Sequence, residues 1–152
     1  MWLLRFQLGN CRDRLAADTL ARHADEVNKV SDQPTIQWLA EPEEHDYPAA
    51  QSYLSLLYDE KTATAYAEKL KRAAVARFKA KDIFRASGLS LLGVSNSHVD
   101  KDRKKIRDGN KLSPLLLVRQ NGGTRVIIAD GYHRLCAVYA VDEDAVIPCK
   151  IV

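Results

Sequence analysis

One short segment holds most of the side chains that could do chemistry in this 152-residue chain: Asp130-Gly131-Tyr132-His133-Arg134. It follows an apolar, β-branched run and precedes apolar residues at helical spacing, so it is predicted to join a strand to a helix. Glycine allows close approach to the backbone, and the first turn of a helix offers N–H donors. Arg134 suits bidentate contact with phosphate, His133 adds a donor, and Asp130 suits a metal ion or a hydroxyl. The segment predicts a phosphate site; the competing interpretation is an ordinary helix start, with Asp130 as N-cap.

A second group of polar residues lies upstream. Asn96 and His98 precede a helix in which Ser97 is predicted to be the N-cap, and residues 97–112 carry 6 Lys/Arg against 3 Asp. Lys101 and Lys105 of this helix are candidates to neutralise phosphate, with Asn96 and His98 brought near the Asp130 turn. The alternative is a solvated basic helix face.

The charge distribution favours an anionic partner for the second part of the chain. Residues 1–59 carry 5 basic and 10 acidic side chains, a net charge of −5, whereas residues 60–152 carry 18 and 10, a net of +8. A basic region attracts nucleotides or nucleic acid, and charge alone does not choose between them. The acidic run at 41–46 lacks the ligand spacing of a calcium loop and is predicted to be a solvated linker.

Composition also bounds the class of protein. With 46% hydrophobic residues the chain can bury a core, and no apolar run reaches the roughly 18–20 residues of a membrane span. The first six residues are too short for a secretory signal, and Cys11, Cys136 and Cys149 suggest neither a disulfide framework nor a zinc site. We therefore expect a cytoplasmic protein with reduced thiols and no membrane partner, and Cys136 on the buried side of its helix.

The remaining elements follow from periodicity and turn chemistry. Helices are predicted at 49–58, 61–76, 81–87 and 97–108. Asp46-Tyr47-Pro48 is a typical start for the first helix, which has Tyr53, Leu54 and Leu57 on its packing side, and Gly88 ends the third. Strands are predicted at 75–79, 114–119, 124–129 and 146–152. The second and third strands form a hairpin around residues 120–123, and Pro148 favours an edge position for the last. The predicted fold class is α+β with a small mixed sheet.

Residues 96–152 resemble the ParB/sulfiredoxin-like domain in three features that occur in order. A charged helix ends at Gly109 and leads into a Leu-x-Pro strand, here Leu112-Ser113-Pro114; a Gly-x-[His/Arg]-Arg turn opens a helix at Gly131; and an Ile-Pro strand closes the chain at 147–152. The resemblance implies a ParB/sulfiredoxin-like domain at 75–152. We expect a helical region at 35–74 packed on it, and an N-terminal extension at 1–34 that is helical or partly mobile.

The residues of the turn determine what the resemblance implies about function. Sulfiredoxins carry a nucleophilic Cys where this chain has Tyr132, so sulfiredoxin activity is not expected. In partitioning ParB proteins, which bind CTP, the turn has the sequence Gly-Glu-Arg-Arg. Only Gly131 and Arg134 of this chain match it. The Asp-Gly-x-His-Arg sequence of the turn is similar to that of free-serine kinases and of proteins described as ParB-like nucleases.

The resemblance and the residues together give one first hypothesis. The protein is expected to bind a nucleotide (ATP or CTP with Mg) or another phosphorylated small molecule, with metal-assisted phosphotransfer or hydrolysis as its reaction. The expected catalytic residues are Asp130, His133 and Arg134, with Asp130 also the metal ligand, and the expected binding residues are Gly131, Tyr132, Asn96, His98, Lys101 and Lys105. Two alternatives stay open: a nucleic-acid-binding protein or nuclease, and a non-catalytic interaction module.

Overall fold

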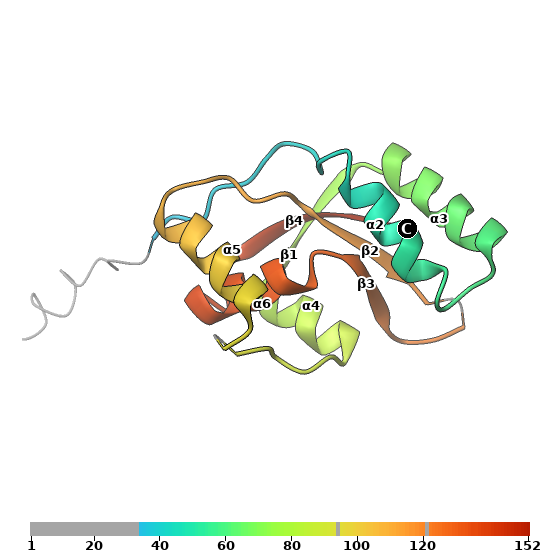
Figure 1. Ribbon diagram of the computed structural model, residues 1–152. Coiled ribbons are helices and arrows are strands. Elements are labelled where there is room, and N and C mark those ends of the chain that lie inside the picture. Colours follow the sequence, from blue (N-terminus) through green and yellow to red (C-terminus); the bar gives the residue numbers. More distant parts are fainter. Residues whose placement is uncertain (1–33, 94, 121) are drawn as a thin grey trace, which may run out of the picture. The chain divides into compact units, whose positions relative to one another are not determined.

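A computed structural model describes residues 34–93, 95–120 and 122–152, and its strands form one mixed sheet (Figure 1). The strands are β1 (Val75–Lys79), β2 (Leu115–Arg119), β3 (Val126–Asp130) and β4 (Val146–Ile151). Their order is β1-β4-β2-β3, with β1 and β4 antiparallel, β2 and β3 antiparallel, and β2 and β4 parallel. The predicted α+β class with a small mixed sheet is therefore confirmed.

Five helices accompany the sheet in the part of the chain that the structure describes. They are α2 (Asp46–Leu54), α3 (Glu60–Arg72), α4 (Ala80–Ser87), α5 (Ser97–Arg107) and α6 (Tyr132–Val141). Within the described residues, none of these helices has the length and apolar character needed to cross a bilayer. The expectations for residues 1–33, which include Cys11, lie outside the described residues.

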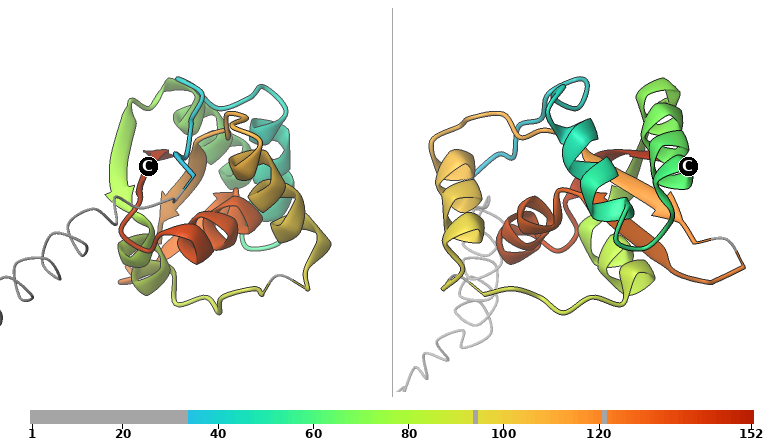
Figure 2. Two further views of the ribbon diagram at one scale, coloured as in Figure 1. Left: turned by 90° about the vertical axis from the view of Figure 1, so that its left-hand side faces the viewer. Right: turned by 45° about the vertical axis from the view of Figure 1, so that its right-hand side comes forward.

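The sheet packs helices on both faces because successive side chains of a strand point to opposite sides. Leu116 and Val118 of β2 join one core cluster with Tyr47 and Leu54 of α2, whereas Leu115 and Leu117 join a second cluster with Ile83 of α4 and Leu135 of α6. Figure 2 shows α2 and α3 on one side of the sheet and α5 and α6 on the other. β2, buried on both faces, is thus the centre of the core.

The predicted hairpin is confirmed, but the position of the last strand is not. β2 and β3 pair antiparallel, and the amide of Gln120 donates to the carbonyl of Arg125 at 3.1 Å. β4 lies inside the sheet and not at its edge, contrary to the expectation from Pro148. The register explains how proline is tolerated there: Pro148 faces Arg77 of β1, and pairing with β2 starts only at Cys149. Proline thus occupies a stretch of β4 with a strand neighbour on one side only.

The first two helices end earlier than predicted. α2 begins at Asp46, which the sequence Asp46-Tyr47-Pro48 predicts as a helix start, and ends at Leu54 instead of residue 58. Leu54 is buried, but Tyr53 and Leu57 are 40% and 49% exposed, so the predicted packing side of this helix is wrong. α3 ends at Arg72 because β1 takes over from Val75. The predicted end of α4 is confirmed: Gly88 is its C-cap in the left-handed conformation, with φ 65°.

Candidate functional site

The Asp130–Arg134 turn lies where β3 ends and α6 begins. Gly131 is the N-cap residue of α6 and has φ 96°, in the left-handed region that favours glycine. A Cβ on this residue would lie 2.9 Å from Cγ of Leu115 and 3.1 Å from Nη2 of Arg134. The protein's own packing therefore requires glycine here. The predicted cap residue is wrong by one position, because Gly131 and not Asp130 is the N-cap of α6.

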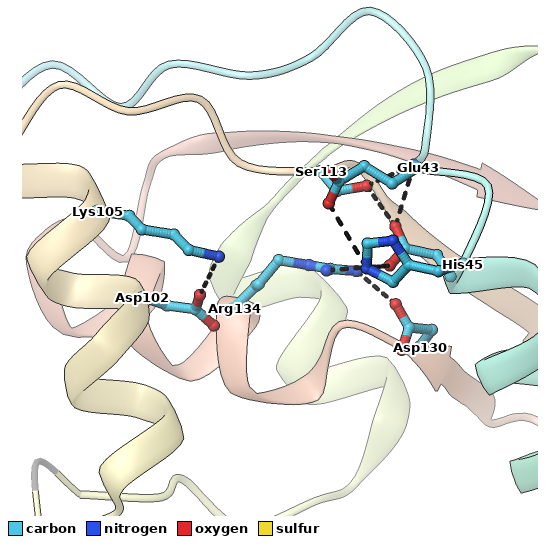
Figure 3. A network of polar contacts seen from close by, with 8 residues as sticks. Glu43, His45, Asp102, Lys105, Ser113, Asp130 and Arg134 are labelled. Atoms are coloured by element: carbon cyan, nitrogen blue, oxygen red, sulfur yellow. Dashed lines mark hydrogen bonds and ion pairs between the residues drawn. The ribbon is translucent and has the colours of Figure 1, made fainter.

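Arg134 lies between two carboxylates. Its Nη2 is 2.5 Å from Oδ2 of Asp130, and its Nη1 is 3.4 Å from Oδ1 of Asp46. The Arg134 side chain is only 14% exposed and that of Asp46 only 2%. Figure 3 shows Arg134 reaching from α6 toward Asp130. Charge-assisted bonds of this kind orient a planar guanidinium firmly. Arg134 is thus engaged from within the protein; its Nε is buried without a hydrogen-bond partner among the described residues.

Asp46 is the residue of this site that sequence reasoning missed. It was expected to belong to a solvated acidic linker, yet it is buried, and the Ser113 hydroxyl donates to its Oδ2. The backbone amide of Glu43 also donates to both Asp46 (3.3 Å) and Ser113 (3.1 Å). Asp46 can be buried because its partner cation, Arg134, lies close to it in the fold, although the two residues are 88 positions apart in the chain. We call Asp46, Ser113, Asp130 and Arg134 the arginine cluster.

The arginine cluster changes the acid–base behaviour of Asp130. Burial of the Asp130 carboxyl raises its pKa, and the negative charge of Asp46 raises it further, while the Arg134 guanidinium acts in the opposite direction; the net pKa is above the ordinary value. Two neighbouring carboxylates that share one cation favour a proton on one of them. A carboxyl with a raised pKa is better matched to proton transfer near neutral pH.

A second group of side chains lies beside the turn, where α5 and α6 begin. His98 and His133, each the second residue of its helix, have ring centroids 5.0 Å apart with an interplanar angle of 35°. His98 is exposed and His133 half-buried. The two form what we call the histidine pair. The expectation that His98 meets the Asp130 turn is therefore confirmed by geometry, although its functional role stays a prediction.

The two helices are capped differently. Asn96, and not the predicted Ser97, is the N-cap of α5: its Oδ1 accepts from the amides of His98 (3.0 Å) and Val99 (3.3 Å). Asn96 thus serves its own helix. Gly131 gives α6 no side-chain cap. Among the described residues none provides an acceptor for the amides of Tyr132, His133 and Arg134. These are the free donors that a helix start presents to an anion.

Tyr132 fixes the loop between α4 and α5. Its hydroxyl donates to the carbonyl of Ser90, and its ring lies 5.9 Å from that of His133, centroid to centroid. Cys136, one turn along, is buried as predicted, and burial raises the pKa of its thiol. A buried thiol with a raised pKa is a poor nucleophile.

The predicted lysines do not contact the turn. Lys105 is paired with Asp102 of its own helix at 3.4 Å, and Lys101 is exposed with no ion pair among the described residues. Figure 3 shows the Lys105–Asp102 pair on α5, apart from the contacts that join Glu43, His45, Ser113 and Asp130. The structure therefore brings together His98 and the turn residues, and leaves Lys101 and Lys105 on the surface of α5.

The acidic run contains one further geometric grouping. Single ligand atoms of Glu43, His45 and Asp46 lie within 4.8 Å of one another. Nε2 of His45 is 3.5 Å from Oδ1 of Asp46, an oxygen that also faces Arg134. Both carboxylate oxygens of Asp46 are thus engaged by protein groups, and the arginine cluster accounts for this arrangement.

Comparison of the chain with protein-family models, with curated proteins and with solved structures finds no match in any of the three.

Proposed function

We propose that this protein binds a phosphate compound, a nucleotide such as ATP or CTP in the first instance, where α5 and α6 begin. The observation that carries the proposal is the histidine pair, His98 and His133 with ring centroids 5.0 Å apart, beside the amides of α6 that lack an acceptor. Backbone N–H groups and the positive end of a helix dipole favour phosphate, and imidazole N–H groups add donors from the side. The ParB/sulfiredoxin-like resemblance, which also rests on the Gly131 turn, supports the same assignment.

The arginine cluster has a supporting role in this proposal. Arg134 is held by Asp46 and Asp130, so it fixes the carboxylate of Asp130 at the end of β3 and adds positive charge behind the turn. Gly131 lets the guanidinium lie against the backbone. We therefore assign phosphate contact to His98, His133 and the α6 amides, and positioning to Arg134.

Magnesium fits this donor set through Asp130. Mg²⁺ is commonly held by one or two carboxylates together with substrate phosphates, and the Asp130 side chain is 21% exposed, unlike the buried Asp46. When bound, the ion would supply neutralisation of phosphate charge. Asp130 would hold it; none of the roles assigned to the histidine pair depends on it.

The reaction class that follows is phosphotransfer or phosphate-ester hydrolysis. Without a bound metal ion, Asp130 is free for the alternative role of base: its raised pKa suits a group that takes the proton from an attacking hydroxyl or water as the new bond to phosphorus forms. The bond from phosphorus to the leaving oxygen breaks, and its electron pair leaves with that oxygen. His98 and His133 would stabilise the charge that gathers on the phosphoryl oxygens.

Nucleotide-dependent thermal stabilisation tests the binding step. Wild type is mixed with ATP, CTP or GTP, each with magnesium, and melting temperatures are compared with those of His133→Ala and His98→Ala. We expect at least one nucleotide to raise the melting temperature of wild type and to lose most of that effect in both variants, since ligand binding stabilises in proportion to RT ln(1 + [L]/Kd). Lys61→Ala, an exposed change on α3, is the control and should respond like wild type.

Two results would contradict this proposal. One is a melting temperature that no nucleotide changes at millimolar concentration. The other is an equal nucleotide shift in wild type and in both histidine variants, which would show that binding occurs elsewhere.

A nucleic-acid-directed function is the second candidate, favoured by the outer face of α5. Lys101, Lys104 and Arg107 of this helix are exposed and have no carboxylate partner among the described residues. Phosphate contacts of this kind give an affinity that falls steeply with salt. Tight DNA binding at 50 mM salt that disappears at 300 mM, and that is lost on replacing these three cations, would place this function ahead of nucleotide binding.

A further inference from the structure

The outer side of β3 has no strand partner among the described residues. β3 is the last strand of the sheet order, and antiparallel pairing to β2 uses one of its two sides. The carbonyl of Arg125 accepts from Gln120, so its hydrogen-bonding groups face β2. Since these groups alternate between the two sides of a strand, those of Val126 and Ile128 face away from the sheet. Among the described residues, no helix or loop bonds to them.

A groove runs beside this edge. It is a cavity of about 270 Å³ that combines β3 residues 126–128 with side chains from two flanking segments. Tyr53 and Leu57 come from α2 and the turn after it, and Leu89 follows α4. These three side chains are 40%, 49% and 43% exposed, so apolar surface lies open on both sides of the strand edge. Exposed apolar surface gathered in a hollow marks an interaction site.

The opposite edge of the sheet, formed by β1, carries charged side chains. β1 carries the charged residues Arg77 and Lys79, both exposed, and Lys79 is paired with Asp144 at 2.9 Å. Charged side chains on an edge strand discourage added strands. β3 has no charge between Val126 and Ala129. Within the described residues, the β3 edge therefore has fewer charged side chains to oppose an added strand than the β1 edge.

We propose that the β3 edge binds an extended peptide of a partner protein as a fifth strand of the sheet. Backbone groups of Val126 and Ile128 would pair with the peptide, and its alternate apolar side chains would enter the groove beside Leu57 and Leu89. Arg125, exposed and without a carboxylate partner among the described residues, lies at one end of the groove. Charge complementarity there selects a peptide with an acidic residue at the end that meets Arg125.

The probe for this proposal is a synthetic seven-residue peptide of alternating valine and threonine with one terminal glutamate. Its binding to the full-length protein is followed by amide NMR shifts. We expect shifts concentrated in β3 and the groove residues, with the same peptide N-methylated at alternate positions binding at least tenfold more weakly. Leu57→Glu should weaken binding tenfold or more, whereas Leu56→Glu, a neighbouring leucine that is 80% exposed and outside the groove, should leave it unchanged.

A backbone variant separates strand pairing from simple apolar contact. Val126→Pro removes an N–H that faces outward, so it should abolish peptide pairing while keeping the β2–β3 ladder, which wild-type-like shifts elsewhere in the spectrum would verify. Equal binding of the N-methylated peptide, shifts centred outside β3, or no shift at millimolar peptide would overturn the proposal. Concentration-dependent dimerisation of the free protein that Val126→Pro abolishes would instead assign this edge to a second copy of the chain and overturn the partner peptide.

Discussion

The arginine cluster and the histidine pair lie at the start of the same helix and differ in how their polar groups are satisfied. In the arginine cluster, Asp46 is 2% exposed and accepts from Ser113, Arg134 and the amide of Glu43. In the histidine pair, His98 is exposed, and the His133 ring lies near the rings of His98 and Tyr132. The carboxylates of the arginine cluster are paired without a ligand, whereas the start of α6 beside the histidine pair presents amides that have no acceptor among the described residues.

This difference shows how the five-residue segment 130–134 serves both structure and binding. Asp130, Gly131 and Arg134 face inward and tie the end of β3 to the start of α2. His133 lies on the other side of the same helical turn and meets α5. Residues that look alike as phosphate ligands in the sequence therefore divide into those that build the site and those that are free to touch a ligand.

The largest expected effect comes from breaking the arginine cluster. Arg134→Ala leaves the buried Asp46 carboxylate without its cation, and removal of one partner of a buried pair typically costs about 3–5 kcal/mol. We expect a loss of that size in the free energy of unfolding, measured by urea denaturation. Arg85→Ala is the matched control, because Arg85 is 82% exposed and only loosely paired with Asp82 at 3.8 Å; it should change stability by less than about 0.5 kcal/mol. A loss below about 1 kcal/mol for Arg134→Ala would show that the cluster is not a structural unit.

The next effect isolates the close packing at Gly131. Gly131→Ala must place a Cβ at φ 96° and within 2.9 Å of Leu115, whereas Gly109→Ala, at φ 71°, meets nothing within 4 Å. The left-handed conformation costs both variants about 1–2 kcal/mol. We expect Gly131→Ala to lose about 2 kcal/mol more than Gly109→Ala in thermal or urea unfolding. Equal losses would mean that the Arg134 guanidinium moves aside freely and that the turn is not tightly packed.

The elements with strong local signals were predictable from the sequence. The hairpin follows from apolar, β-branched runs around a Gly-rich turn, and the end of α4 follows from Gly88, whose φ of 65° suits glycine. The buried position of Cys136 follows from the helical spacing of its neighbours. In each case a few adjacent residues determine the structure.

The features that depend on distant contacts were not predictable in this way. The burial of Asp46 depends on its contacts with Ser113 and Arg134. The sequence of residues 41–46 does not indicate that these distant residues pack against it. The inner position of β4 depends on where its register with β2 begins, and Pro148 alone suggested the opposite. The candidate site was found only in part, because sequence spacing shows which residue types are present and not which of them are already paired.

A smaller effect sharpens the contrast between the two helix starts. Asn96→Ala removes the oxygen that accepts from the amides of His98 and Val99, so we expect a loss of about 1 kcal/mol in unfolding free energy. Ser97→Ala, the cap predicted from sequence, should change it by less than about 0.5 kcal/mol, since Ser97 is the first residue of the helix and makes no cap bond. If the two variants lose the same amount, the assignment of Asn96 as the cap is wrong.

The smallest expected effect is on the pH dependence of the free energy of unfolding, to which Asp130 and Asp144 contribute with opposite signs. The pKa of Asp130 is raised above its ordinary value of 3.8, chiefly by burial, so the native state keeps a proton that the unfolded state loses, and the free energy of unfolding falls as pH rises above about 4. Hydrogen bonds from Lys81 and Lys79 lower the pKa of Asp144 to about 2, so its contribution is present above its ordinary pKa of 3.8 and is lost as pH falls toward 2. Urea unfolding of wild type, Asp130→Asn and Asp144→Asn across pH 2–7 separates the two. Relative to Asp130→Asn, wild type should lose stability with rising pH, and relative to Asp144→Asn it should gain stability between about pH 2 and 4. Parallel curves for wild type and Asp130→Asn would mean that Arg134 cancels the effect of burial on Asp130, and Asp130 would then have no raised pKa to suit it to proton transfer near neutral pH.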